Sequence, residues 1–288
     1  MISTLFFGSC SKAPSHGYAC LAATDRDGRS RRRARLTIET REYDSMRLAT
    51  ITTGSGPIKV GLVHGLGASG ATWEPLIDRM LSDGRFTVIA VDLRGHGSSE
   101  RAASYKLDDF ADDVAENLPE GLHSIIGHSL GGPVLVRAVE RLAPARAIYL
   151  DPGFELALPT TGITGRLFWL VPPVSLGVAQ LIQTRRSGKA GALTEPSIRS
   201  LLEQSHEQFD TRMAIGVFRD VAFHPLAPSV PAVPSTLVLS DDSPAVISDT
   251  LAGALQQLGW DVRRLPGLHH DMHLENADRT FEAIHDLL

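Results

Sequence analysis

The sequence predicts an α/β protein with a mostly parallel sheet, helices on both faces of the sheet, and an inserted helical segment. Apolar runs alternate with amphipathic segments from about residue 58 to 151, and the alternation returns from 230 to the end. Strands that alternate with helices are joined by crossovers, which cover both faces of a parallel sheet. The alternation breaks between 152 and 229, where we expect a mostly helical cap.

The hydrophobic pattern of each core segment predicts its strands. The first two segments alternate apolar and polar residues, which is typical of an antiparallel edge with one solvated face. The later segments are short apolar runs, which are typical of strands buried on both faces. In chain order the expected strands are 35–43, 46–54, 58–65, 86–92, 122–128, 146–151, 235–242 and 260–267.

Helices are expected where apolar residues recur three and four positions apart. In 71–81 these residues are Trp73, Leu76, Ile77 and Met80. The same spacing predicts further core helices at 107–118, 130–142, 245–259 and 277–288, and a helix at 198–209 in the cap.

Composition divides the chain into three parts. Residues 1–35 are polar with an arginine run, and we expect them to form a disordered extension whose targeting role stays open. Residues 36–151 and 230–288 form the core, and 152–229 form the cap. Cys10 and Cys20 both lie in the extension, and their number and spacing predict neither a disulfide framework nor a metal cluster.

The overall charge limits the classes of partner. The chain is 43% hydrophobic and carries a net charge of -5, so it has no global basic field for nucleic acid or an anionic membrane. No segment reaches the roughly 18 apolar residues that a membrane span needs. We therefore expect a soluble, cytoplasmic protein with a small-molecule ligand, no nucleic-acid partner and no membrane span. The oligomeric state is not predicted.

The segment Gly127–Gly131 has the pattern G-x-S-x-G and lies between an expected strand and an expected helix. In that context the pattern predicts a sharp turn that exposes the hydroxyl of Ser129 at the carboxyl ends of the strands, where open α/β sheets bind ligands. The Leu130 N–H, at the helix N-terminus, would point toward the reacting centre and stabilise negative charge there.

With this motif in place, the chain resembles the α/β-hydrolase superfamily, over about 36–288. The resemblance implies an eight-stranded-type sheet and a capped, single-domain enzyme with a serine nucleophile. It also implies that Leu66, in the oxyanion loop, supplies a second N–H beside that of Leu130. The segments that carry the resemblance are VHGLGAS, VDLRGHGSS, GHSLGG and LPGLHHDMHLEN.

The resemblance places the catalytic histidine after the last strand, in a pattern close to G-H-x-x-x-x-E. Glu275 lies five residues after His270, so His270 is the expected general base. His269 stands where the family usually has glycine. The remaining histidines that we considered are expected to shape turns or to occupy ordinary positions: His64, His96, His128, His273 and His285.

Three aspartates compete for the acid of the triad. The family usually supplies the acid after the strand that precedes the last helix–strand pair, often before a proline. Alignment on Pro244 puts Ser243 there, and a serine cannot stabilise an imidazolium as a carboxylate does. Alignment on the strand end puts Asp241 or Asp242 there, and some family members instead carry the acid where Asp151 stands. We rank the three candidates Asp241, Asp242 and Asp151, in that order.

A second glycine pattern, G-x-G-x-x-G at 65–70, raises a competing interpretation. It follows an expected strand, and Asp92 lies about twenty residues later, as in a dinucleotide-binding fingerprint. However, His64 stands directly before the first glycine, and Asp92 belongs to a tight glycine-rich turn. A nicotinamide-dependent oxidoreductase is therefore the least favoured alternative.

The sequence thus predicts a serine hydrolase that cleaves a carboxylic ester, lactone or thioester through an acyl-enzyme. The substrate is expected to be small to medium and partly apolar, and no cofactor or metal is expected. Two alternatives on the same fold remain: a ligand-binding receptor, and a non-hydrolytic acyltransferase or C–C lyase. A serine at the turn argues against the haloalkane dehalogenase and epoxide hydrolase chemistries of this superfamily, which use an aspartate there.

Overall fold

The computed structural model describes residues 45–155, 161–163, 195–243 and 246–288, which all belong to one unit, Glu42–Leu288. The expected strand 35–43, the extension 1–35 and both cysteines lie outside the described residues. The same holds for 156–160 and 164–194 of the expected cap, so its boundaries stay a prediction.

A seven-stranded sheet forms the centre of the described part, and its strand order is β1-β3-β2-β4-β5-β6-β7. Only the pairing of β1 with β3 is antiparallel, so the mostly parallel α/β fold is confirmed. The strands are β1 Thr50–Gly54, β2 Ile58–Val63, β3 Phe86–Val91, β4 Ser124–His128, β5 Arg146–Leu150, β6 Ser235–Leu239 and β7 Asp261–Arg264.

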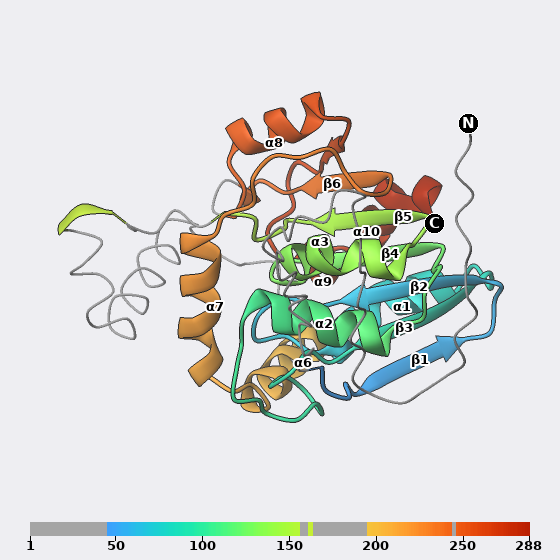
Figure 1. Cartoon of the computed structure of the whole chain (residues 1–288). Coiled ribbons are helices and arrows are strands. Elements are labelled where there is room, and N and C mark those ends of the chain that lie inside the picture. Colours follow the sequence, from blue (N-terminus) through green and yellow to red (C-terminus); the bar gives the residue numbers. More distant parts are fainter. Residues whose placement is uncertain (1–44, 156–160, 164–194, 244–245) are drawn as a thin grey trace, which may run out of the picture. The chain divides into compact units, whose positions relative to one another are not determined.

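Helices cover both faces of this sheet (Figure 1). One apolar core lies between the sheet and helices α2, α3 and α8, and another lies between the sheet and helices α1 and α10. The core helices are η1 Gly70–Trp73, α1 Glu74–Leu81, α2 Leu107–Asn117, α3 Gly131–Leu142, α8 Asp249–Gln257, α9 Met272–Glu275, α10 Ala277–Ile284 and η3 His285–Leu287.

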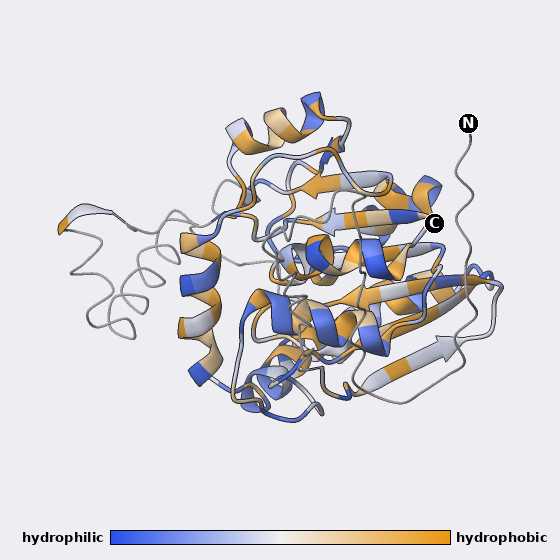
Figure 2. Ribbon diagram, viewed as in Figure 1, coloured by the Kyte–Doolittle hydropathy of each residue, from blue (hydrophilic) through white to orange (hydrophobic). Residues whose placement is uncertain are grey.

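Each inner strand contributes side chains to both cores, because successive residues of a strand point to opposite faces. Ile125 of β4 packs in the first core and Ile126 in the second. The inner strands are therefore largely hydrophobic, and Figure 2 shows β1 paler than β2. This is the pattern from which the sequence predicts a doubly covered sheet.

Two elements start four residues later than the sequence predicts. The first half of 46–54 is not strand, because side chains bind its backbone: Asp113 accepts from the Met46 N–H at 2.7 Å and Asn117 from the Leu48 N–H at 2.9 Å. The expected helix 245–259 begins at Asp249, where the Ser248 hydroxyl caps it by accepting from the Leu251 N–H at 3.1 Å.

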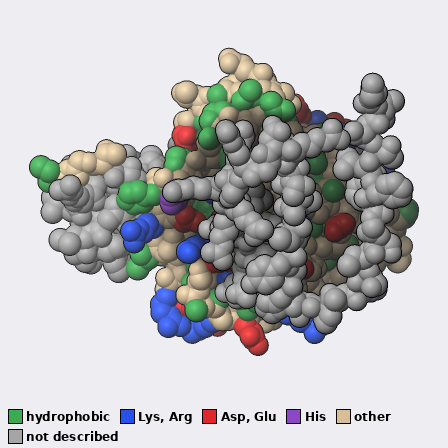
Figure 3. Space-filling model, viewed as in Figure 1, with side chains coloured by type: hydrophobic (Ala, Val, Ile, Leu, Met, Phe, Trp, Pro, Cys, Tyr) green, Lys and Arg blue, Asp and Glu red, His purple; other side chains and the backbone are tan. Residues whose placement is uncertain are grey.

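Between β5 and β6 the described residues contain two helices, α6 Pro196–Glu207 and α7 Arg212–Phe223. Helix α7 lies across the end of the sheet toward which β6 points (Figure 1), so this segment borders the carboxyl ends of the parallel strands. Around these helices the Lys and Arg side chains are interspersed with acidic and apolar ones in Figure 3.

Within the described ranges, no helix has the length and apolarity that crossing a membrane requires.

Candidate active site

The turn between β4 and α3 holds Ser129 in the left-handed region, with φ 49°. Such a conformation costs a residue with a Cβ about 1–3 kcal/mol and persists where the surroundings determine it. Here the Ser129 N–H donates to the Leu150 carbonyl at 3.1 Å, and the Ser129 carbonyl accepts from Gly132 and Gly153 at 3.0 and 2.9 Å. The turn is thus held from both sides, with Ser129 half-buried at the surface.

The glycines of this turn are needed for close backbone contacts. A Cβ on Gly127 would lie 2.7 Å from the Gly131 carbonyl oxygen, and a Cβ on Gly131 would lie 2.2 Å from that of Val63. Gly65 is also constrained, because its Cβ would lie 3.0 Å from the Cβ of Ser129. The loop after β2 therefore rests directly against the serine.

His270 lies in the loop after β7, with its Nε2 3.0 Å from the Ser129 Oγ. Burial lowers the pKa of His270, but the hydrogen bond to Asp151 and the charges of Asp271, Asp151 and Asp242 outweigh it, so the pKa is raised above its usual 6.5. A proton on Nδ1, facing Asp151, leaves Nε2 free to accept the hydroxyl proton of Ser129. The two side chains that the motifs single out are thus in direct contact.

Asp151 directly follows β5, and its Oδ2 lies 3.4 Å from the His270 Nδ1. The side chain is fully buried, and the loop after β6 surrounds it with donors. Oδ1 accepts from the Ser240 N–H at 2.8 Å and from the Ser243 hydroxyl at 2.5 Å, and Oδ2 accepts from the Ser240 hydroxyl. Burial raises the pKa of Asp151, but the bonds to His270, Ser240 and Ser243 outweigh this and lower it.

The two other candidate aspartates have different partners. Asp241 is exposed, and its Oδ2 accepts from the Gly267 N–H at 2.8 Å. Asp242 is half-buried, and its N–H donates to the Ser240 hydroxyl at 3.0 Å. Among the three candidates it is Asp151 that contacts His270, so the geometry does not support the ranking with Asp241 first.

Sequence reasoning did not assign a role to Ser240 and Ser243, which hold the Asp151 carboxylate. A signal was present at Ser243, because the family resemblance places an acid at that position and this chain has a hydroxyl. The hydroxyl donates to Asp151 from the neighbouring strand end instead. The buried carboxylate is thereby hydrogen-bonded on both oxygens.

The backbone N–H groups of Leu66 and Leu130 are the expected oxyanion donors. Leu130 is the N-cap residue of α3, so its N–H lies at the positive end of the helix dipole. Leu66 directly follows Gly65, which contacts the serine. No described residue accepts a hydrogen bond from either N–H. An N–H group without a partner can donate to negative charge that develops near it.

Two histidines of the turn motifs tie loops together. The His64 Nδ1–H donates to the Gly65 carbonyl at 2.8 Å, and its Nε2 accepts from the Leu93 N–H at 3.0 Å. The His128 Nε2–H donates to the His270 carbonyl at 3.0 Å. Burial and the proximity of His270 lower the pKa of His128 to about 4. Both side chains thus hold neighbouring loops together by hydrogen bonds, as expected from their motifs.

Asp92, the acid of the competing dinucleotide fingerprint, binds backbone groups of its own loops. Its Oδ1 accepts from the Gly70 N–H at 2.6 Å and its Oδ2 from the Ser98 N–H at 2.8 Å. A ribose would have to displace one of these bonds. The carboxylate instead joins the start of η1 to the turn after β3.

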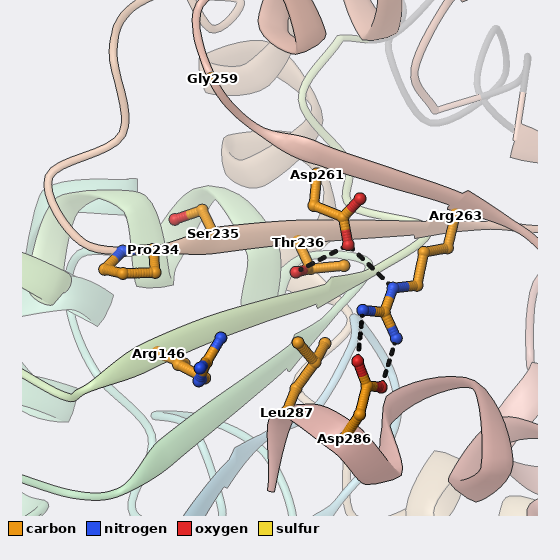
Figure 4. Close-up of a pocket in the computed structure, with 9 residues that line it drawn as sticks. All are labelled: Arg146, Pro234, Ser235, Thr236, Gly259, Asp261, Arg263, Asp286 and Leu287. Carbon is orange, nitrogen blue, oxygen red and sulfur yellow. Dashed lines mark hydrogen bonds and ion pairs between the residues drawn. The ribbon is translucent and has the colours of Figure 1, made fainter.

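A cavity of about 310 Å³ lies at the amino ends of β5, β6 and β7, at the opposite edge of the sheet from Ser129 (Figure 4). Its charged groups largely neutralise one another: Arg263 donates to Asp286 at 2.6 and 2.8 Å and to Asp261 at 2.8 Å. None of the candidate catalytic residues lines it.

Comparison with known proteins identifies the family. The family model described as the alpha/beta hydrolase family matches residues 62–283, which include Ser129, Asp151 and His270. The chain belongs to the alpha/beta hydrolase family. This membership confirms the resemblance found in the four sequence segments.

Two curated relatives match part of this chain. The 2-(acetamidomethylene)succinate hydrolase of Mesorhizobium japonicum is 45% identical over 92 residues, which cover 31% of this chain and 32% of the relative. A pimeloyl-[acyl-carrier protein] methyl ester esterase of Nitrosomonas europaea is 38% identical over 86 residues, 30% of this chain and 32% of the relative. The alignments span about a third of the length of these relatives.

Solved structures share the fold over most of the chain. A hydrolase from Oleispira antarctica has a TM-score of 0.65 at 20% identity, covering 84% of this chain and 94% of that one. The enol-lactonase from Burkholderia xenovorans LB400 has a TM-score of 0.66 at 19% identity, covering 83% and 95%. At these identities the likeness concerns the fold alone.

Proposed function

We propose that this α/β hydrolase is a serine esterase that cleaves its substrate through an acyl-enzyme. The observation that carries the proposal is the line of contacts from the Ser129 Oγ to the His270 Nε2 at 3.0 Å and from the His270 Nδ1 to Asp151 at 3.4 Å. A nucleophile, a base and an acid that orients the base form the arrangement required for acyl transfer. Asp151 therefore takes the role of the acid in this proposal.

Acylation begins when the Ser129 Oγ attacks the substrate carbonyl carbon and His270 accepts the hydroxyl proton. Asp151 stabilises the resulting imidazolium, and the N–H groups of Leu66 and Leu130 donate to the oxyanion. The tetrahedral intermediate collapses as the C–O bond to the alcohol breaks. His270 gives its proton to the departing alcohol oxygen, which leaves the acyl group on Ser129.

Deacylation repeats these steps with water. His270 takes a proton from the water, whose oxygen attacks the acyl carbon, and the same two N–H groups stabilise the second oxyanion. The bond to the Ser129 Oγ then breaks, and His270 returns the proton to that oxygen. The carboxylic acid leaves, and the enzyme regains its starting protonation state.

We propose a small to medium, partly apolar ester or lactone as the substrate, with a thioester as a variant of the same chemistry. The names of the relatives support an acyl substrate, since one names a methyl ester and another a substituted succinate. The apolar residues Phe168 and Trp169, on which the sequence expectation of an apolar substrate rests, lie outside the described residues.

Labelling with a fluorophosphonate probe tests the nucleophile. We expect the folded protein to be labelled once, at Ser129, and to hydrolyse p-nitrophenyl butyrate. Ser129→Ala should lose both properties, whereas Ser200→Ala, an exposed serine of α6, should keep both. Labelling at another residue, or undiminished turnover by Ser129→Ala, would refute the proposal.

Product analysis separates the alternatives on the same fold. A ligand-binding receptor would bind the ester without steady turnover. An acyltransferase would pass the acyl group to an added alcohol or thiol in preference to water, and a C–C lyase would leave simple esters intact. Stoichiometric release of acid and alcohol favours the esterase over all three.

A further inference from the structure

His96 is a buried histidine in the turn after β3 that takes no part in the proposed triad. Its side chain is 0% exposed. The ring packs against His64, with centroids 4.9 Å apart, and against Phe209, which follows α6, with centroids 5.1 Å apart. It therefore lies between the loop after β2 and the segment that joins α6 to α7.

The ring nitrogens of His96 have fixed hydrogen-bond roles. Nε2 accepts from the Gly67 N–H at 3.1 Å, and Nδ1–H donates to the Arg94 carbonyl at 3.1 Å. A backbone N–H can only donate, so Nε2 has to be unprotonated. Burial and the neighbouring His64 lower the pKa of His96 well below its usual value, so the ring stays neutral.

Gly67 directly follows Leu66, whose N–H is the proposed oxyanion donor. Gly67 has φ 75°, a conformation that glycine adopts readily, so its own backbone restrains the loop weakly. The bond from its N–H to His96 restrains the orientation of the Leu66–Gly67 peptide. Because the Gly67 N–H already has a partner in His96, the Leu66 N–H is the one of these two groups that can donate to the substrate.

The segment around α6 holds the same two loops. The Asp210 N–H donates to the Gly95 carbonyl at 2.9 Å, directly before His96. The hydroxyl groups of Ser205 in α6 and Ser69 in the loop after β2 are 2.8 Å apart and buried. Helix α6 is thus bonded to the oxyanion loop through Ser205, and the residues that follow the helix are bonded to the turn of His96 through Asp210.

We propose that His96 is a positioning residue that fixes the oxyanion loop for catalysis, and that the Ser205–Ser69 contact couples helix α6 to that loop. The proposal rests on the proposed function, because it assigns Leu66 as an oxyanion donor. His96 touches no reacting atom and acts through Gly67.

The test compares His96→Phe, which keeps the aromatic packing but loses the acceptor, with His96→Gln, whose side-chain oxygen can accept from Gly67. Ser205→Ala removes the contact to Ser69, and Ser200→Ala is its exposed control on the same helix. Each variant is assayed for kcat and KM on p-nitrophenyl butyrate and for affinity toward a trifluoromethyl ketone. Addition of Ser129 to this ketone creates an oxyanion and transfers the hydroxyl proton to His270.

Loss of one oxyanion donor costs about 100- to 1000-fold in kcat, so a misplaced donor should cost less, about tenfold. We expect His96→Phe to lower kcat and ketone affinity about tenfold each with KM within about twofold. His96→Gln should recover most of both, and Ser205→Ala should show a smaller loss of the same kind. Unchanged kcat and ketone affinity in folded His96→Phe would overturn the proposal.

Hydrogen exchange at the amides of 64–70 gives a readout that does not depend on activity. His96→Phe should exchange faster there than the wild type, and His96→Gln should not. If the wild type neither cleaves the ester nor binds the ketone, the proposed function fails and exchange alone decides the role of His96. If His96→Phe does not fold, His96→Gln and Ser205→Ala still decide the role of His96. A His96→Gln variant that is inactive but exchanges at the wild-type rate at 64–70 would contradict the proposal.

Discussion

Replacing Asp151 with asparagine removes the charge beside His270 while keeping the shape of the side chain. Opposite unit charges 3.4 Å apart, the distance from Oδ2 to Nδ1, attract by about 5 kcal/mol at an effective dielectric constant of about 20. Because about 1.4 kcal/mol corresponds to a factor of ten in rate, this attraction corresponds to a rate factor of about 10³ to 10⁴. We expect kcat/KM to fall by about 10³ to 10⁴, the loss typical of a triad aspartate replaced by asparagine.

The assay measures kcat and KM for p-nitrophenyl butyrate, with active enzyme counted by fluorophosphonate labelling. Asp241→Asn and Asp242→Asn are the matched controls, since both residues lie in the loop that surrounds Asp151. Each control should stay within about threefold of the wild type, because neither carboxylate contacts Nδ1. A fall of 10³ in Asp241→Asn with an active Asp151→Asn would refute our assignment of the acid.

The pH profile of the same variant gives a second readout. His270 accepts the Ser129 proton only when neutral, so kcat/KM should decline as pH falls through its pKa, which is raised above 6.5. Asp151→Asn removes a hydrogen bond and a negative charge that both favour the protonated ring. The acidic limb should therefore move to lower pH, and a shift to higher pH would contradict the assigned contact.

The remaining predictions concern stability, measured by urea unfolding. Gly131→Ala should cost about 3 kcal/mol or more, because its Cβ would lie 2.2 Å from the Val63 carbonyl oxygen. Gly253→Ala, within α8 and with nothing within 4 Å of its Cβ, should instead stabilise the protein by about 0.5–1 kcal/mol. Asp113→Ala should cost about 3–5 kcal/mol, because Arg94 is buried and loses bonds of 2.6 and 2.8 Å. A cost below about 1 kcal/mol in Gly131→Ala or Asp113→Ala would contradict the packing described here.

Local patterns were sufficient to predict most strands and helices and the turn at Ser129, whereas His270 was expected from the family resemblance. The strands are short apolar runs, and G-x-S-x-G demands a turn whose glycines prevent backbone clashes at Gly127 and Gly131. Errors occurred at the ends of elements, where side chains from elsewhere bind the backbone. The bonds of Asp113 and Asn117 to the N–H groups of Met46 and Leu48 are examples, because no local sequence pattern indicates these bonds.

The acid could not be chosen from local sequence, because its partner comes from another strand. Asp241, Asp242 and Asp151 all follow a strand end, so each satisfies the same one-dimensional condition. The difference arises in the sheet, where the loop after β6 turns the hydroxyls of Ser240 and Ser243 toward Asp151. A serine at the position where the family usually has the acid indicates that the acid comes from elsewhere.

Strand register explains how the dispersed motifs form one site. In the parallel pairing of β2 with β4, Val63 lies opposite Gly127, so Gly65 and Ser129 both stand two residues beyond a paired position. In the pairing of β4 with β5, His128 lies opposite Leu150, so Ser129 and Asp151 each follow a paired residue.

The oxyanion loop, the serine and the aspartate therefore leave three adjacent strands at one level of the sheet. The chain turns sharply at two of these points, since Ser129 and Asp151 both have a left-handed backbone, with φ 49° and 38°. The two glycine patterns of the sequence, which suggested different chemistries when taken separately, lie on neighbouring strands. Their shared position explains why Gly65 contacts Ser129 and why an anion site after β2 would serve the proposed nucleophile after β4.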